Sequence, residues 1–334
     1  MQVTGYGVQN PGLQFESIKI DLEEISSTEV LIDVTHCGIC HSDLSMAKNE
    51  WQITTYPLIP GHEVVGTISQ LGSNVRGFEV GDTVGLGWHS DYCMACKCCE
   101  SGDHNLCSES TGTIVGRHGG FAERVKANAA SVVKIPDGLD HNTIGPLLCG
   151  GITVFNPLVE FGIKPTDRVG VIGIGGLGSM AIQFLSAWGC EVTAFTSSKS
   201  KIEAVKKLGA RHSIDSRDPN QLELVESSFD FLISTVNVKL DWGKYISALK
   251  PKGRLHFVGA TLDPLDISVM PLLAKQRSIS GSPVGSPSTI KKMLDFVVRH
   301  QINPLVEVFP MDKVNEAVAH LEAGKARYRV VLKR

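Results

Sequence analysis

Four cysteines have the spacing of a metal-binding loop. Cys93, Cys96, Cys99 and Cys107 are separated by two, two and seven residues. Two-residue gaps let neighbouring thiolates point at one cation, and four thiolates complete a closed tetrahedral zinc shell. Because no coordination position remains for a substrate, we expect a structural zinc here. Free thiols, an iron–sulfur centre and a zinc ribbon that contacts nucleic acid are the alternatives.

A glycine-rich turn is the second feature that could do chemistry. Residues 173–178 fit the pattern G-x-G-x-x-G, between an apolar run at 168–172 that predicts a strand and an amphipathic stretch at 177–188 that predicts a helix. Glycines in this position permit a tight turn, let the backbone approach a pyrophosphate and allow the helix to pack closely on the strand. The alternative is a glycine-rich turn without a ligand. The expected dinucleotide site consists of Gly173, Gly175, Gly176, Leu177 and Gly178.

The residues after the next predicted strand indicate which nicotinamide cofactor binds. An Asp or Glu there would accept hydrogen bonds from the ribose hydroxyls and repel a 2′-phosphate. Residues 196–201 instead read Thr-Ser-Ser-Lys-Ser-Lys. Hydroxyl and ammonium groups suit a phosphate that carries about −1.5 to −2 charges. We therefore predict NADPH, bound by Ser197, Ser198 and Lys201. A serine that caps the following helix is the alternative, and both roles can coexist.

Three further fragments contain candidate metal ligands or nucleophiles. They are Cys-Gly-Ile-Cys-His-Ser-Asp at 37–43, Gly-His-Glu at 61–63 and Cys-Gly-Gly-Ile-Thr at 149–153. Sequence spacing alone does not bring these fragments together. Taken singly, each is more often a buried thiol or a hydrogen-bonded histidine, and Cys37 with Cys40 is also readable as a redox pair.

The elements that must position these residues divide the chain into two unlike parts. Residues 1–150 contain short β-branched runs separated by Gly, Asn and Pro, among them 30–34, 63–68 and 83–86. A partly open β-barrel would contain many such strands. After about residue 150, strand-like runs alternate with helical stretches, which predicts a parallel, doubly wound sheet. Its strands are expected at 168–172, 191–195, 229–233, 254–258 and 278–282. Another strand-like run stands at 328–332.

The overall composition limits the function classes. Of 334 residues, 42% are hydrophobic and 20% charged, and Lys plus Arg (32) against Asp plus Glu (35) gives a net charge of −3. This balance argues against a nucleic-acid partner, as do the acidic residues around the four-cysteine loop. We expect neither a membrane span nor a signal peptide. Nine cysteines, an odd number, favour metal binding over disulfides and predict a cytoplasmic protein.

The three fragments, the four-cysteine loop and the run Gly-Ile-Gly-Gly-Leu-Gly occur in the same order as in a known family. The chain resembles the zinc-containing medium-chain alcohol dehydrogenases, in particular the cinnamyl alcohol dehydrogenase group and its bacterial broad-range NADPH-dependent aldehyde reductases. The resemblance covers essentially the whole chain, including residues 145–154 and 324–333. It implies a catalytic GroES-like domain at 1–150 and 285–334, and an NADP-binding Rossmann domain at 151–284.

The resemblance also implies a second zinc, which is catalytic. Its ligands would be Cys40, His62 and Cys149, with one position open. Glu63 matches the carboxylate that can visit the metal when water or product leaves. Asp43 matches the acid that orients the zinc-bound histidine.

Other roles that the resemblance implies concern protons, substrate and assembly. Ser42 matches the hydroxyl that passes a proton to the alkoxide, but Ser45 replaces the histidine that continues this relay in many relatives. Ribose hydroxyls, Ser45 and water are candidates for the outer part of the relay. The pocket residues would be Trp51, Trp88 and Val284, which favour apolar aldehydes, although either tryptophan could be ordinary core packing. The sheet edge at 278–282 could pair across a homodimer.

Together these features predict a zinc-dependent enzyme that reduces aldehydes with NADPH and works reversibly as an alcohol dehydrogenase. A narrower cinnamyl or sugar alcohol dehydrogenase of the same family is the alternative. A zinc-stabilised binding protein and a zinc-free quinone reductase are disfavoured, because Cys40, Ser42, His62, Glu63 and Cys149 are all present.

Overall fold

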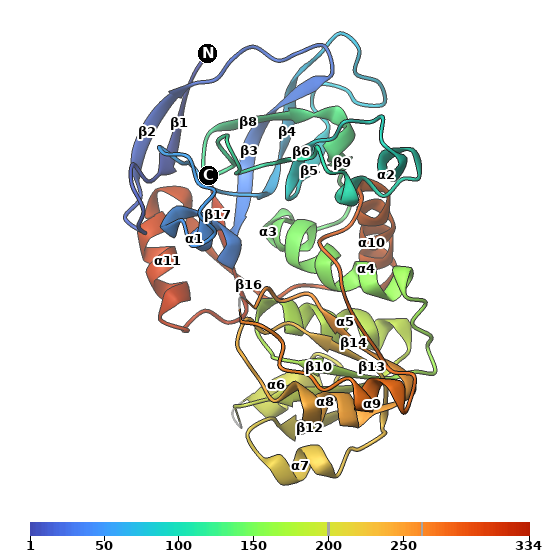
Figure 1. Ribbon diagram of the computed structural model, residues 1–334. Helices are drawn as coiled ribbons and strands as arrows, with labels where there is room; N and C mark the ends of the chain where they lie inside the picture. The colour runs from blue at the N-terminus through green and yellow to red at the C-terminus, as the bar shows by residue number, and fades with distance from the viewer. Residues whose placement is uncertain (199–200, 262) are drawn as a thin grey trace. The chain divides into compact units, whose positions relative to one another are not determined.

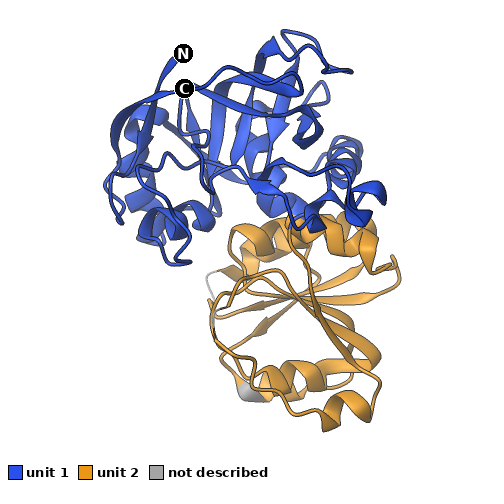
Figure 2. Cartoon of the chain, turned by 45° about the horizontal axis from the view of Figure 1, so that its top comes forward, with its two compact units in different colours: residues 1–152, 284–334 blue, residues 153–283 orange. Residues whose placement is uncertain are grey.

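The structure is a computed structural model that describes residues 1–334 except 199, 200 and 262. The chain divides into two compact units, Met1–Ile152 with Val284–Arg334 and Thr153–Pro283, which Figure 2 shows in blue and orange. Each unit has its own core of buried hydrophobic side chains. The first unit contains both ends of the chain, so the second unit is an insertion.

The main sheet of the first unit is built around its longest strand, β3. The described strands lie in the order β16-β17-β3-β4-β5-β9, and β8 also pairs with β3. Residues 36–39 of β3 pair with β17 and residues 29–33 with β8, while β4 pairs along most of the other edge. Their bounds are Glu29–Ile39 (β3), Glu63–Leu71 (β4), Thr83–Leu86 (β5), Arg124–Asn128 (β8), Val132–Lys134 (β9), Val306–Pro310 (β16) and Arg329–Lys333 (β17). The expected GroES-like, partly open β-structure is confirmed.

Short elements complete the first unit. Two further sheets pair β1 (Gln2–Gly7) with β2 (Glu16–Asp21) and β6 (His89–Asp91) with β7 (Thr111–Gly112). The α-helices are α1 (His41–Lys48), α2 (Lys97–Glu100), α3 (His141–Pro146), α10 (Pro287–His300) and α11 (Val314–Glu322). A π-helical turn, Leu147–Gly151, follows α3. Residues 1–150 therefore contain helices where the sequence predicted only strands and loops, because helices of four to eight residues are too short to show a clear helical period.

The second unit is a parallel sheet with helices on both faces, as Figures 1 and 2 show. Its described strands lie in the order β12-β11-β10-β13-β14-β15, and every pairing is parallel. The strands are β10 (Arg168–Ile172), β11 (Glu191–Thr196), β12 (His212–Asp215), β13 (Phe229–Ser234), β14 (Leu249–Phe257) and β15 (Ser278–Gly281). The helices are α4 (Ile152–Glu160), α5 (Gly176–Trp188), α6 (Ile202–Lys207), α7 (Pro219–Glu223), α8 (Trp242–Ala248) and α9 (Met270–Leu273). The predicted doubly wound sheet is confirmed, and its strand order reverses between β10 and β13, where such folds bind ligands.

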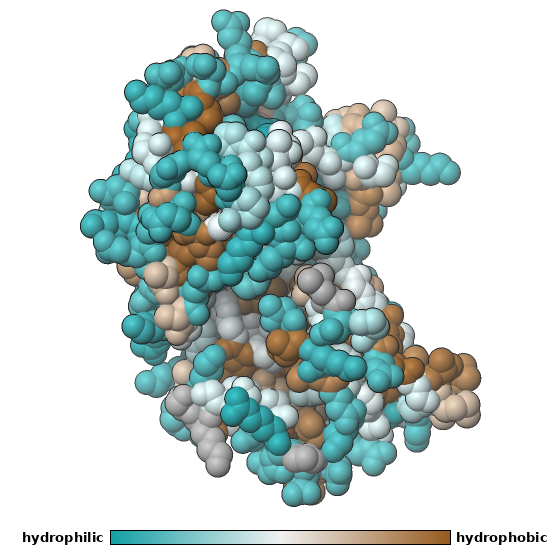
Figure 3. All heavy atoms as spheres, turned by 60° about the vertical axis from the view of Figure 1, so that its left-hand side comes forward, coloured by the Kyte–Doolittle hydropathy of each residue, from teal (hydrophilic) through white to brown (hydrophobic). Residues whose placement is uncertain are grey.

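Hydrophilic and apolar side chains share the surface of the protein. Hydrophilic side chains are spread over the face that Figure 3 shows, between smaller groups of apolar ones. Within the described ranges, no helix is both long and apolar enough to cross a membrane.

Candidate active site and metal-binding groups

Helix α1 positions a buried acid behind the candidate metal ligands. The backbone N–H of Cys40, just before the helix, donates to Oδ2 of Asp43 at 2.8 Å and so caps the first turn. Oδ1 of Asp43 accepts from the Gly61 N–H at 2.9 Å and lies 2.8 Å from Nδ1 of His62. Asp43 and His62 are both fully buried. The carboxylate therefore ties α1 to residues 61–62 and orients the His62 ring.

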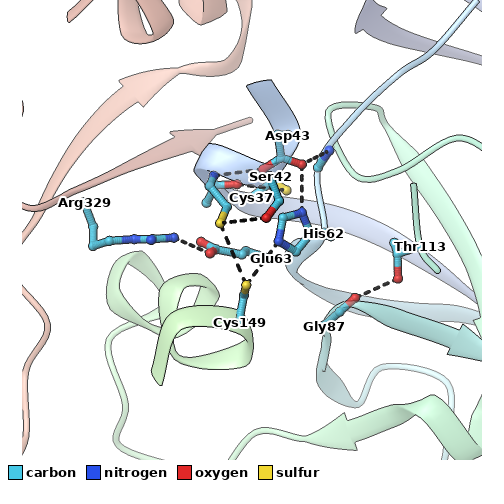
Figure 4. Close-up of polar contacts among 12 residues, drawn as sticks. Cys37, Ser42, Asp43, His62, Glu63, Gly87, Thr113, Cys149 and Arg329 are labelled. Atoms are coloured by element: carbon cyan, nitrogen blue, oxygen red, sulfur yellow. Dashed lines mark hydrogen bonds and ion pairs between the residues drawn. The ribbon is translucent and has the colours of Figure 1, made fainter. Parts of the chain in front are cut away.

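Cys40, His62 and Cys149 come together from three distant segments, as Figure 4 shows. Nε2 of His62 lies 3.2 Å from Sγ of Cys149, and Sγ of Cys40 lies 3.9 Å from the same sulfur. With one carboxylate oxygen of Glu63, these ligand atoms all lie within 4.8 Å of one another. Two thiolates on one tetrahedral zinc, each about 2.3 Å from the metal, stand about 3.8 Å apart. The two sulfurs thus have the spacing of zinc ligands.

The electrostatics of this group also fit a bound cation. Cys149 and His62 hydrogen-bond to Cys40 and lower the pKa of its thiol well below the ordinary value, although burial acts the other way. The contact with Cys40, reinforced by burial, raises the pKa of Cys149. Burial would lower the pKa of His62, but Asp43 raises it above its usual range. A divalent cation bound between the two sulfurs would favour deprotonation of both thiols.

A buried ion pair lies beside the ligand group. Nη2 of Arg329, at the start of β17, donates to Oε1 of Glu63, at the start of β4. Burial raises the pKa of Glu63 to about 7, and Arg329 opposes that rise. Oε2 of Glu63 is buried and has no hydrogen-bond partner among the described residues. A buried carboxylate oxygen left unpaired beside three soft or borderline metal ligands is a further sign that the group fits a metal.

The four-cysteine loop forms the second candidate metal group. Sγ of Cys93 lies 3.9 Å from that of Cys99 and 3.5 Å from that of Cys107, and Cys96 completes a set whose ligand atoms are all within 4.8 Å. Helix α2 begins after Cys96 and carries Cys99 inward. Tyr92 packs against Cys99 and Cys107. These distances fit a closed zinc shell.

The glycine-rich turn has the conformations that a dinucleotide-binding turn requires. Gly173 has a φ of +87°, which favours glycine. A Cβ at Gly178 would lie 2.0 Å from the carbonyl oxygen of Gly173, whereas a Cβ at Gly175 would meet no atom within 4 Å. Gly176 and Leu177 begin α5, so its N-terminal N–H groups follow the exposed Gly175. The backbone at Gly175 is therefore open to a ligand's phosphate.

The residues predicted to select the cofactor lie after β11. Ser197 is exposed, and the Ser198 N–H donates to Oγ1 of Thr196 at 3.2 Å. Nζ of Lys201 donates to the carbonyl oxygen of Ile174 at 2.7 Å. Lys201 thus connects the start of α6 to the glycine-rich turn. Lys199 and Ser200, which stand between these residues, lie outside the described residues.

The predicted pocket residues adjoin the ligand group in part. The Trp88 ring centroid lies 5.0 Å from that of His62 and 6.0 Å from that of Trp51. Trp88 and Val284 line one small depression with Leu148. Both tryptophans are half-buried and also pack against the core of the first unit. The structure thus places Trp88 against His62, with Trp51 and Val284 next to Trp88, and the tryptophans contribute to packing as well.

Helix α1 also carries Ser42, which lies near the ligand group, and Ser45, which is hydrogen-bonded to an exposed side chain. Oγ of Ser42 lies 3.8 Å from Sγ of Cys40. Ser45, one turn further along the same helix, is buried, and its hydroxyl donates to Oε2 of the exposed Glu50 at 2.6 Å. The pairing of Ser45 with Glu50 was not anticipated, because nothing in the sequence shows that residue 50 folds back onto the helix.

Comparison with known proteins assigns the family. Residues 26–137 match the alcohol dehydrogenase GroES-like domain, and residues 176–299 match the zinc-binding dehydrogenase family. The chain is 58% identical over 330 residues to the aldehyde reductase AdhA of Synechocystis sp., covering 99% of this chain and 98% of that protein. The chain belongs to the zinc-containing alcohol dehydrogenases.

Solved structures of related enzymes match the fold of this zinc alcohol dehydrogenase over nearly their whole length. The cinnamyl alcohol dehydrogenase SbCAD4 of Sorghum bicolor matches with a TM-score of 0.95 at 34% identity, covering 100% of this chain and 98% of that one. The CAD of Helicobacter pylori complexed with NADP(H) matches with a TM-score of 0.92 at 30% identity, with the same coverage. The expectation of a catalytic and a structural zinc site is confirmed for this dehydrogenase.

Arg329 also lies near this centre, and it is not among the site residues that the sequence predicts. A signal was present, because an arginine opens the apolar run Arg-Val-Val-Leu and a charge inside a buried strand needs a partner. Its partner, Glu63, lies 266 positions away in the sequence, so only the fold identifies the pair.

Proposed function

We propose that this protein reduces aldehydes to primary alcohols, reversibly, by hydride transfer from NADPH at a zinc centre. The observation that carries the proposal is the buried group of Cys40, His62 and Cys149, whose spacing and charge fit three zinc ligands with one position left for a substrate. A zinc ion held there would polarise a carbonyl group and stabilise negative charge on its oxygen. The 58% identity to a protein named aldehyde reductase supports this direction of the reaction.

The surrounding side chains have distinct tasks in this proposal. Cys40, His62 and Cys149 bind the metal, and Asp43 keeps His62 in one orientation through Nδ1. Ser42 donates the proton that the product alcohol needs, since its hydroxyl lies 3.8 Å from the ligand sulfur of Cys40. Ser45 and Glu50 supply an outlet for proton exchange, because the buried Ser45 hydroxyl ends on an exposed carboxylate.

The second unit supplies the cofactor site. The positive φ of Gly173, the open backbone at Gly175 and the N-terminus of α5 suit a pyrophosphate. Ser197, Ser198 and Lys201 would bind the 2′-phosphate, and the absence of an acid at the end of β11 removes the group that would repel it. The NADP(H) complex of the Helicobacter pylori relative supports the same choice.

Apolar aldehydes are the proposed substrates, since Trp88 packs against His62 and is itself next to Trp51 and Val284. A narrower preference for cinnamyl or sugar alcohols is the second candidate, favoured by the likeness to proteins named cinnamyl alcohol dehydrogenase and mannitol dehydrogenase.

Oxidation of NADPH in the presence of aliphatic, aromatic and sugar aldehydes tests both candidates. We expect turnover with aliphatic and aromatic aldehydes, and kcat/KM at least about tenfold higher with NADPH than with NADH. Activity confined to cinnamyl or sugar aldehydes would favour the second candidate. Equal performance with NADH would contradict the roles of Ser197, Ser198 and Lys201.

The assembly and location are part of the proposal. Strand β15 is the last strand of the described sheet in the second unit, and Val269, Met270 and Leu273 of the preceding segment are 60%, 67% and 66% exposed. These features support a homodimer that pairs along β15, which sedimentation analysis tests. All nine cysteines lie within the described residues and none forms a disulfide, which supports a cytoplasmic location.

A further inference from the structure

Three adjacent strands of the first unit form a cradle around the side chain of Glu63. Glu63 stands in β4, opposite Gly38 of β3, and Val331 of β17 stands on the other side of Gly38. An ideal Cβ at Gly38 would lie 1.9 Å from Oε2 of Glu63 and 3.0 Å from its Cδ. The φ of Gly38 does not require glycine. The glycine is therefore needed at this position because the carboxylate occupies the space of a side chain.

Arg329 holds the other oxygen of the same carboxylate. Arg329 is 5% exposed and its guanidinium donates to Oε1 of Glu63, and Figure 4 shows the carboxylate pointing toward it. Oε1 is thus held by a charge-assisted hydrogen bond and Oε2 lies over Gly38. One of the two oxygens is also within 4.8 Å of the sulfurs of Cys40 and Cys149 and of the His62 ring nitrogen.

We propose that Gly38 and Arg329 are positioning residues that hold the Glu63 carboxylate beside the catalytic metal and not on it. The coordination position left open by Cys40, His62 and Cys149 is then available to the substrate oxygen. Arg329 holds the carboxylate through a charge-assisted hydrogen bond, and Gly38 leaves room for the carboxylate because it has no side chain. The inference rests on the proposed catalytic metal site, and it assigns a role to two residues for which the sequence predicted none.

Adding one methyl group at Gly38 should push the carboxylate toward the metal. The three atoms nearest to the new Cβ all belong to the Glu63 side chain, so the strand itself can stay in place. Glu63 is already fully buried, so a movement away from both Arg329 and the metal ligands would leave its charge uncompensated among apolar side chains. The displaced carboxylate would instead move toward the metal ligands, where a divalent cation would stabilise an anionic oxygen.

Metal-directed spectroscopy of the Gly38→Ala variant tests this displacement independently of turnover. Cobalt(II) in place of the catalytic zinc reports its ligand set in the visible spectrum, whereas zinc is spectroscopically silent. Imidazole serves as the probe of the open position. We expect an altered cobalt spectrum and imidazole affinity reduced at least about tenfold, because Glu63 competes for the position. Gly12→Ala is the matched control, since a Cβ there meets no atom within 4 Å.

Two further variants make the result decisive. In Gly38→Ala with Glu63→Gln, the spectrum and the imidazole affinity should match those of Glu63→Gln alone, because a neutral amide is a weak ligand. Arg329→Lys, which keeps the charge but loses the guanidinium fork, should shift the spectrum in the same direction as Gly38→Ala and also covers the case in which that variant fails to fold.

The outcomes separate this inference from the proposed function. Two metals per chain with an unchanged cobalt spectrum in both single variants would overturn the role of Gly38 and Arg329 only. A spectral change that persists in the Glu63→Gln background would overturn it as well, because the effect would not act through the carboxylate. A wild-type protein that binds one metal per chain would instead overturn the catalytic metal site itself.

Discussion

The two metal-binding groups of this dehydrogenase differ in how the chain assembles them. The four-cysteine group comes from one stretch of fifteen residues, 93–107, and two of its members are only partly buried. The catalytic group takes its members from three segments up to 109 positions apart, and all are buried. The first group is organised by its own loop, whereas the second depends on the register of the main sheet and on a π-helical turn.

The chemistry around the two groups differs in the same way. The contacts of the four-cysteine group include those among its own thiols and with Tyr92. The catalytic group is backed by Asp43 on one side and by the Glu63–Arg329 ion pair on the other. A closed shell of four thiolates contributes stability, while a mixed set with an adjustable carboxylate leaves a position for chemistry.

The largest effect should come from breaking the catalytic group. Cys149→Ser replaces a thiolate by a poor zinc ligand. We expect metal analysis to show one zinc per chain in place of two, and kcat/KM to fall at least about a thousandfold, since several kcal/mol of transition-state stabilisation is lost. Cys190→Ser is the control, because Cys190 is buried but belongs to neither group. Full activity in Cys149→Ser would show that the catalytic assignment is wrong.

The next largest effect should be a loss of stability when the four-cysteine group is broken. Cys96→Ser opens the closed shell, and we expect the free energy of unfolding to drop by several kcal/mol, while the molecules that stay folded keep most of their activity. Urea unfolding followed by fluorescence measures the change, and Cys98→Ser, outside the group, should unfold like the wild type. If Cys96→Ser abolished turnover without loss of stability, the contrast between the two groups would fail.

A smaller effect should follow from a change behind the catalytic ligands. Asp43→Asn keeps the shape of the side chain but weakens the acceptor for Nδ1 of His62. The affinity for the catalytic metal should fall about 10- to 100-fold, measured by competition with a chelator, while the four-cysteine site keeps its zinc. An equal loss at both sites would indicate general unfolding and would contradict a specific role for Asp43.

Strand positions were the most predictable part of the fold. The expected strands 83–86 and 168–172 coincide with β5 and β10, because short apolar runs that contain β-branched residues are typical of strands buried on both faces. Strand β12 was not predicted, since His-Ser-Ile-Asp has no apolar pattern. Helices α10 and α11 were not predicted either, although the Ser286 side chain caps α10 by accepting from the Thr289 N–H.

The candidate sites were predictable to different degrees for a physical reason. Ligands within one loop follow from spacing, so the four-cysteine group could be derived from the residues alone. Cys40, His62 and Cys149 needed a resemblance, because their approach depends on sheet pairing that no local pattern encodes. The contacts of Gly38, Glu50 and Arg329 depend on side-chain positions, which only the folded chain shows.

The placement of β17 has a consequence for how the protein is made. This strand, within six residues of Arg334, lies between β16 and β3 inside the main sheet, and it carries the cation that neutralises Glu63. During synthesis the ribosome delivers Glu63 long before its counter-charge. The first unit therefore lacks an interior strand, and Glu63 lacks its counter-charge, until residues 329–333 have been synthesised and have paired with β3.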